Sequence, residues 1–290
     1  MRRFTQWFAA VLLLLIAAGP SALAQPDSAR MTPFPGFRIA DNLYYVGSKD
    51  LASYLITTSQ GDILINSSYV ASVPLIQKSI EGLGFKMSDI KILLISHAHD
   101  DHDAGSAEIK RLTGAKYMVM DADVPVVESG GASDFFYNSP KNRYPPTKVD
   151  RVLHDGDEVR LGGAVLVAHK TPGHTKGCTT WTMKVMDKGK SYNAVIVGSW
   201  NVNPGFRLVD NKAYPEQAQD YEKTFRILKS LPCDIFLGAH GGYFDMLDKY
   251  SRMKSSPSNV FVDPVGYKAM VEKKDLEFRK EWKRQQEGGK

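Results

Sequence analysis

Side chains that bind metal ions are concentrated in residues 96–102, which read Ser-His-Ala-His-Asp-Asp-His. Imidazole and carboxylate groups at this density suit a borderline metal such as zinc. A single histidine is more often a structural or surface residue than a ligand. Four potential ligands in the order H-x-H-x-D-H are much harder to obtain by chance, so this segment predicts a metal site.

The spacing within this segment indicates two sites. His97 and His99 are two residues apart and can point the same way from extended backbone. Asp101 and His102 are adjacent, so their side chains diverge and can serve a second ion. One segment can thus begin two metal sites, provided that distant residues complete them.

The neighbouring residues place these ligands on a loop between a strand and a helix. Residues 92–95 are a short apolar run, which predicts a buried strand. Ile109 and Leu112 follow at helical spacing and predict a helix after Asp103. A rigid scaffold can direct side chains from such a loop into a cleft.

Two further turns each present one histidine. Residues 171–177 read Thr-Pro-Gly-His-Thr-Lys-Gly and present His174 between two expected strands. Residues 238–242 read Gly-Ala-His-Gly-Gly and present His240 after an apolar run. The small flanking residues allow other groups to approach closely. Of the remaining histidines, we expect His154 to lie at the surface and His169 to be structural.

Apolar patterning predicts an α/β protein. We expect strands at residues 43–46, 53–56, 63–65, 92–95, 117–120, 165–169, 179–185, 193–197 and 235–237, and two paired strands within residues 152–161 around the turn at 155–157. We expect longer helices at residues 73–83, 215–231 and 264–286. Strands followed by helices, twice over, predict two sheets packed face to face with helices outside. No linker divides the chain, so residues 25–290 are expected to form a single domain.

One long segment, residues 128–147, lacks such a pattern. It is rich in Gly, Ser, Pro and Asn, but it also contains Phe135, Phe136, Tyr137 and Tyr144. A long loop in a compact domain is usually functional or disordered. Two interpretations remain open: a flap that faces a substrate, or aromatic side chains that hold the loop on the core.

Residues 1–24 have the composition of a secretory signal peptide. Arg2 and Arg3 precede an apolar stretch at residues 8–18, and residues 22–24 read Ala-Leu-Ala, a small-x-small cleavage site. We therefore expect a periplasmic protein with no membrane segment after cleavage, and a polar lead at residues 25–34 without regular structure. Without the two arginines the formal charge of +5 falls to about +3, too little to indicate nucleic-acid binding.

The two cysteines, Cys178 and Cys233, are too few for a disulfide scaffold. An exported protein permits a disulfide between them. A buried free thiol at Cys178 is an equal alternative. Zinc ligation is less favoured, because neither cysteine has a C-x-x-C companion.

The ordered motifs H-x-H-x-D-H, Thr-Pro-Gly-His-Thr and a late Gly-x-His after a strand resemble those of the metallo-β-lactamase superfamily. The resemblance covers about residue 37 to the C-terminus. It implies an αββα sandwich, with two central mixed sheets, helices on both outer faces, and metal ions at one edge. It also implies two zinc ions, the first bound by His97, His99 and His174 and the second by Asp101, His102 and His240. Asp100 falls on a variable position of the motif and is not expected to be a ligand.

The residue at position 199 favours one subclass within this superfamily. Many members that are not lactamases have a metal-bridging aspartate in a Gly-Asp pair at a strand end, where this chain has Gly198-Ser199. The ligand set and this serine resemble subclass three of the class B β-lactamases, which implies a β-lactam substrate whose carboxylate lies near Ser199 and Asn201. An asparagine in this role is a departure from the subclass. A second departure is that no cysteine follows Cys233, so the disulfide that is common in this subclass cannot form.

The expected activity is therefore zinc-dependent hydrolysis of penicillins, cephalosporins and carbapenems by a monomeric enzyme that confers antibiotic resistance. Zinc makes a hydroxide available near neutral pH, and Asp101 is expected to orient it. Two alternatives remain. One is another exported metallohydrolase of the same fold, a lactonase or thioesterase, against which Ser199 argues. The other is a zinc-binding protein without turnover, against which a complete ligand set argues.

Overall fold

The computed structural model describes residues 28–288 of the 290-residue chain. The expected signal peptide at residues 1–24 lies outside this part. Among the helices within it, we find none that combines the length and the apolar character needed to cross a membrane.

A seven-stranded sheet forms from the first half of the chain, with its strands in sequence order. Its strands are β1 (Phe37–Ala40), β2 (Leu43–Tyr45), β3 (Tyr54–Ile56), β4 (Asp62–Ile65), β5 (Ile90–Leu94), β6 (Lys116–Met120) and β7 (Arg151–Leu153). Pairing is antiparallel from β1 to β4 and parallel from β4 to β7. Parallel strands are covered on both faces, which explains the continuous apolar runs of β4 and β5.

A five-stranded sheet forms from the second half, in the order β12-β11-β10-β9-β8. Its strands are β8 (Glu158–Leu161), β9 (Ala164–Lys170), β10 (Thr179–Asp187), β11 (Lys190–Val197) and β12 (Ile235–Gly238). Only the β11–β12 pair is parallel. Both sheets are therefore mixed, as predicted.

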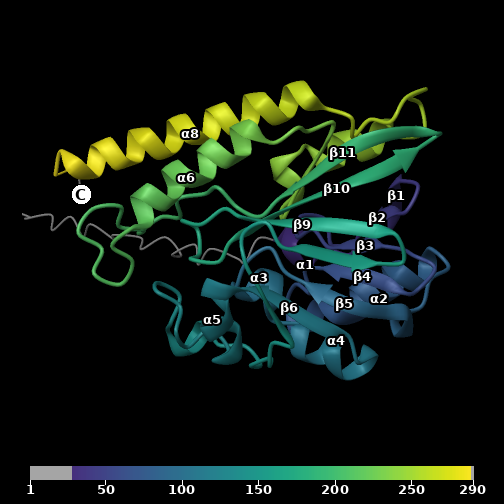
Figure 1. Cartoon of the computed structure of the whole chain (residues 1–290), viewed down its shortest axis with the longest axis horizontal. Helices are drawn as coiled ribbons and strands as arrows, with labels where there is room; N and C mark the ends of the chain where they lie inside the picture. The colour runs from purple at the N-terminus through teal and green to yellow at the C-terminus, as the bar shows by residue number, and fades with distance from the viewer. Residues whose placement is uncertain (1–27, 289–290) are drawn as a thin grey trace, which may run out of the picture.

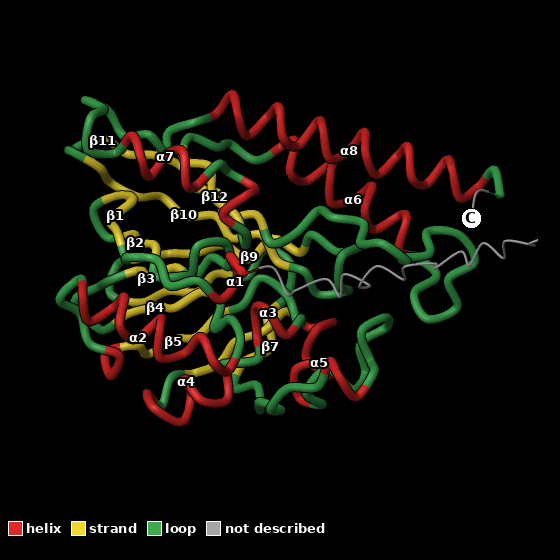
Figure 2. Tube along the Cα trace, turned by 180° about the vertical axis from the view of Figure 1, so that it is seen from behind, coloured by secondary structure: helices red, strands yellow, loops and turns green. Residues whose placement is uncertain are grey.

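Helices cover the outer face of each sheet (Figure 1). The first sheet packs against α2 (Val73–Gly82), α4 (Ser106–Thr113) and α5 (Val124–Glu128), and the second against α6 (Gln217–Ser230) and α8 (Pro264–Gln286). Seen from behind, the strands of both sheets lie between these two helical layers (Figure 2). Buried Tyr54 and Trp181 belong to the core shared by the two sheets. The predicted αββα sandwich is confirmed.

The short helices were not predicted. They are α1 (Ser28–Met31), α3 (Asp100–Asp103), α5 and α7 (Met246–Arg252), together with 3₁₀ turns at Val70–Ser72, Met87–Asp89, Asp121–Asp123, Pro140–Asn142 and Gly241–Tyr243. The expectation of an irregular lead at residues 25–34 was wrong for its described part. Residues 28–31 form α1, and the Phe34 ring packs on Tyr250 with a centroid separation of 4.8 Å. Packing of this partly buried aromatic ring fixes the lead on the domain.

Candidate metal centre

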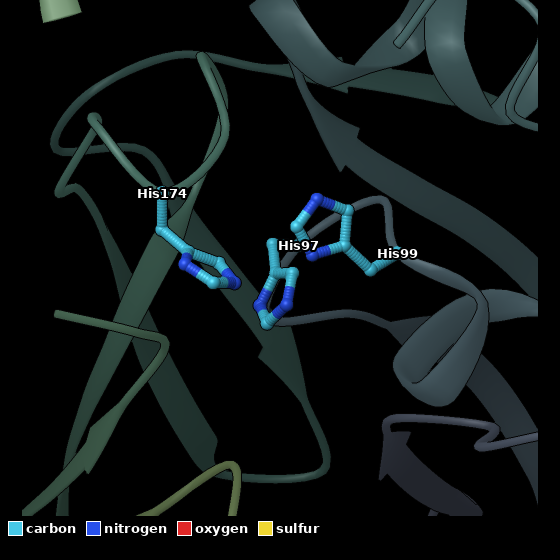
Figure 3. Close-up of side chains that lie close together, drawn as sticks. All are labelled: His97, His99 and His174. Carbon is cyan, nitrogen blue, oxygen red and sulfur yellow. The ribbon is translucent and has the colours of Figure 1, made fainter. Parts of the chain in front are cut away.

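The three predicted ligands of the first ion lie together. His97 and His99 follow β5, and His174 lies in the turn between β9 and β10. Metal-binding atoms of these three side chains lie within 4.8 Å of one another. In the close-up, the His174 ring points toward His97 across the space between the two loops (Figure 3). Segments remote in sequence thus meet at one edge of the sandwich.

The three predicted ligands of the second ion lie beside this group. Metal-binding atoms of Asp101 and His102, both in α3, lie within 4.8 Å of His97. His240, which follows β12, places its Nε2 atom 3.2 Å from His102 Nε2 and 3.8 Å from Asp101 Oδ2. The structure therefore brings all six predicted ligand side chains together.

Outer hydrogen bonds fix the orientation of two imidazoles. His174 Nδ1 lies 2.8 Å from the carbonyl oxygen of Asn201, and His240 Nδ1 lies 3.0 Å from Asp50 Oδ2. Nδ1–H donates in both pairs, so the Nε2 lone pair of each ring is free to bind a metal ion. Asp50 was not predicted as a functional residue. It follows β2 in a loop without a motif, and only the fold brings it to His240.

Burial keeps four of the predicted ligand histidines, His97, His99, His102 and His174, neutral. It is the largest cause that lowers the pKa of His99 to about 4, of His102 to about 3 and of His174 to about 3. Burial and the neighbouring imidazoles hold the pKa of His97 well below its usual value. Burial alone would raise the pKa of Asp101, but His102, His240 and other neighbours lower it overall. Neutral imidazoles and an ionised carboxylate are the forms that bind metal ions.

These residues fit zinc. Within residues 28–288, two buried ring nitrogens of the predicted first-ion ligands, His97 Nδ1 and His99 Nε2, have no hydrogen-bond partner. Buried polar atoms normally have partners, and exceptions call for an explanation. Neutral imidazoles and one carboxylate, gathered with nitrogens unpaired, form a donor set typical of zinc.

A cavity of about 490 Å³ opens beside His99, His174 and His240. Tyr137 and Tyr144 of the 128–147 loop line it. In the same loop, Phe135 and Phe136 pack on Phe206, with ring centroids 5.2 and 4.9 Å apart. Both interpretations of the loop therefore describe part of it, because some aromatic rings face the cavity and others hold the loop in place.

The two predicted substrate-binding residues lie in different surroundings. Ser199 is 1% exposed and its Oγ lies 3.2 Å from the Tyr243 hydroxyl. Asn201 lines the cavity, and its Nδ2 donates to the same hydroxyl over 3.0 Å. Ser199 is not among the residues that line the cavity, whereas Tyr243 is. The substrate-binding role of both residues stays a prediction.

The remaining histidines and the cysteines lie away from the ligand group. The His154 side chain is exposed, and His169 Nε2 lies 2.8 Å from Thr182 Oγ1 on the neighbouring strand β10. Cys178 is buried and Cys233 is partly buried, and both are free thiols. The alternative of a disulfide between them was wrong.

Comparison with known proteins identifies the family. The sequence pattern described as "Metallo-beta-lactamase superfamily" matches residues 51–240. The chain belongs to the metallo-β-lactamase superfamily. Within it, the chain is similar to the FEZ-1 metallo-β-lactamase from Legionella gormanii, with 59% identity and a TM-score of 0.87 over 88% of this chain and 98% of that one. It is also similar to BJP-1, a subclass B3 metallo-β-lactamase of Bradyrhizobium japonicum, with 36% identity and a TM-score of 0.84 over 90% and 98%.

Several curated proteins match over a shorter stretch. A hydroxyacylglutathione hydrolase from Fuscovulum blasticum is 34% identical over 94 residues, which are 32% of this chain and 28% of that protein. The corresponding enzyme of Pseudomonas aeruginosa is 32% identical over 93 residues, or 27% of its length. The chain therefore matches less than a third of these curated relatives, but nearly the whole of the two β-lactamases.

The lowered histidine pKa values predict that acid pH destabilises this protein when no metal is bound. Below pH 6.5, the usual histidine value, the unfolded chain binds protons that folded His99, His102 and His174 exclude down to about pH 3–4. The free energy of unfolding should fall with decreasing pH in this window, by about 1.4 kcal/mol per unit for each histidine. Urea unfolding of chelator-treated protein at pH 7, 6 and 5 measures this slope. If the pH dependence of the free energy of unfolding were unchanged in His174→Gln, the contribution assigned to His174 would be wrong.

Proposed function

We propose that this chain is a β-lactamase that hydrolyses the β-lactam amide bond with two zinc ions. The 59% identity with FEZ-1, which extends over 98% of that enzyme, supports the activity most strongly. The meeting of six ligand side chains from three remote parts of the sequence supports the metal centre. Together these observations support a zinc-dependent hydrolase whose reaction takes place at this ligand group.

We assign His97, His99 and His174 to the first zinc ion and Asp101, His102 and His240 to the second. Bound zinc lowers the pKa of water toward 7 and polarises a carbonyl group. The Asp101 carboxylate accepts a hydrogen bond from the attacking water and orients it toward the lactam carbonyl carbon. Asn201 and Asp50 hold the His174 and His240 rings in place through their outer nitrogens. No protein nucleophile is needed.

The loop around the cavity positions the substrate. The Tyr137 hydroxyl accepts from Asn203 Nδ2 over 2.9 Å and so joins the 128–147 loop to the loop after β11. The Tyr137 ring also packs edge-on against His99, with centroids 4.9 Å apart. This wall shields the His99 side of the centre from water, which strengthens electrostatic interactions inside it.

A thioesterase is the second candidate, because the hydroxyacylglutathione hydrolases match part of the chain. A zinc-binding protein without turnover is the third. We expect the purified protein to hydrolyse nitrocefin and imipenem, and to lose this activity when a chelator removes the metal and regain it with added zinc. Thioester or lactone turnover without lactam turnover would favour the second candidate. Zinc binding with no turnover would favour the third.

We further propose that the enzyme acts in the periplasm as a monomer. Residues 1–24 supply the export signal, and residues 25–290 form the single catalytic domain. The location suits the activity, because β-lactams reach that compartment before their cellular targets.

A further inference from the structure

We propose that Arg30 binds the carboxylate group of the β-lactam substrate and so helps to determine specificity. This inference rests on the proposed function. Arg30 lies in α1, within the polar lead that the sequence motifs do not include. Its guanidinium lines the same cavity as the metal centre. A residue from the N-terminal lead thereby becomes part of the substrate site.

The position of Arg30 is defined by its contacts. Its Nη1 atom lies 3.1 Å from Asp101 Oδ2 and 3.5 Å from the Tyr69 hydroxyl. The Arg30 side chain remains 38% exposed. Guanidinium has five N–H donors, so these two contacts leave donors for a further partner.

The lead is attached to the domain on both sides of Arg30. Lys49 N–H donates to the Thr32 carbonyl over 2.9 Å, and the Ser48 hydroxyl lies 3.4 Å from the Ala29 carbonyl. Met31 Sδ lies 3.3 Å from Ser72 Oγ. These contacts hold the backbone of α1 at the cavity, so Arg30 does not depend on a free chain end for its position.

The charge of the cavity lining makes Arg30 distinctive. Among the described residues that line the cavity, Arg30 is the only lysine or arginine. The acidic lining residues are Asp50, Asp100, Asp101 and Asp134. A β-lactam antibiotic has a carboxylate next to the lactam nitrogen, and the acidic lining residues outside the proposed ligand set would repel it. Beside the proposed zinc ions, Arg30 adds a positive charge from the protein and the paired donors that carboxylates prefer.

The geometry also suits the reaction. Asp101 belongs to the proposed second-ion group, and Arg30 lies directly beside it. A substrate carboxylate on Arg30 would place the adjacent lactam nitrogen near Asp101, His102 and His240. Ser199 Oγ, in contrast, is buried against Tyr243. Arg30 is therefore better placed than Ser199 for first contact with the carboxylate.

A substrate pair tests this role: a penicillin and its methyl ester, which lacks the negative charge. For zinc-loaded Arg30→Gln, we expect KM for the acid to rise roughly tenfold, with a much smaller change for the ester. Arg30→Lys should restore part of the preference for the acid. The Kd of each ring-opened product can be measured by calorimetry, with the original carboxylate next to the nitrogen either free or methylated. In Arg30→Gln, we expect the Kd of the product with the free carboxylate to rise more than that of the methylated product. Arg38→Gln, an exposed β1 residue, is the matched control.

Zinc content and zinc affinity are measured on every variant, because Arg30 also contacts Asp101. An unchanged ratio of acid to ester KM in Arg30→Gln would overturn the proposal, as would equal losses for both substrates that follow reduced zinc affinity. If the unmodified enzyme hydrolyses neither substrate, the proposed function itself has failed. The two failures are therefore distinguishable.

Discussion

Replacement of Asp101 by alanine is expected to lower kcat/KM for a carbapenem by about 10²–10⁴-fold, the range for loss of a group that orients a proton transfer. Asp101 is buried with an ionised carboxylate, and its oxygens lie 3.5 Å from His102 Nε2 and 3.8 Å from His240 Nε2. The variant removes a proposed zinc ligand and the group that orients the attacking water. Steady-state kinetics with imipenem, together with zinc content, measure both effects.

His240→Ala should give a loss of similar order, because it removes a ligand of the same proposed ion from a different loop. His154→Ala is the matched control, since the exposed His154 lies away from the site. Wild-type hydrolysis by either Asp101→Ala or His240→Ala would disprove the assignment of the second ion. A loss in His154→Ala as large as in these variants would point to a general folding defect instead.

The ligand side chains were predictable because their chemistry is local in sequence. The order H-x-H-x-D-H puts four of the six proposed ligands in one short segment, and His174 and His240 each lie in a turn of small residues after a strand. The sheet and helix layers of the sandwich were predictable because they too depend on patterns that are local in sequence. Apolar runs such as β4 and β5 are long enough to reveal strands, and α6 and α8 bury a regular stripe.

The residues that support the ligands were not predictable, because their roles arise only from tertiary contacts. Asp50 accepts from His240, which is far away in the chain. Arg30 lies in a lead whose polar composition indicated no structure, yet α1 holds it against Asp101. Neither residue has a local pattern that distinguishes it from an ordinary surface charge. The proposed centre therefore depends on side chains that a motif does not identify.

Asp123 is the clearest such residue, because it connects the two loops that hold the first-ion group. It is 1% exposed, at the end of the Asp121–Asp123 turn. Its Oδ2 accepts from the Ala98 N–H over 3.0 Å and from the Thr175 hydroxyl over 2.8 Å, while Oδ1 accepts from the Gly177 N–H over 2.7 Å. Ala98 lies between His97 and His99, and Thr175 follows His174. One carboxylate thus sets the distance between these loops.

The fit around Asp123 leaves little room for adjustment. A Cβ atom on Gly177 would lie 2.6 Å from the Asp123 backbone nitrogen and 2.7 Å from its Cβ, so glycine permits this close approach. Burial raises the pKa of Asp123 to about 6, which leaves the group ionised at pH 7.5. All three partners are donors. An asparagine would therefore direct its own amide donor at one of them, and a buried group would lose its hydrogen bond.

For Asp123→Asn we accordingly expect zinc affinity at the first site to fall by about 10–100-fold, the usual effect of losing a residue that orients metal ligands. Competition with a chromophoric chelator at pH 7.5 measures this affinity without relying on turnover. Asp121→Asn is the matched control, because Asp121 lies two residues away and pairs with Lys170 outside the site. Equal zinc affinity in Asp123→Asn and the unmodified protein would show that the loops keep their separation without this carboxylate. A fall in the free energy of unfolding alone would assign Asp123 a purely structural role.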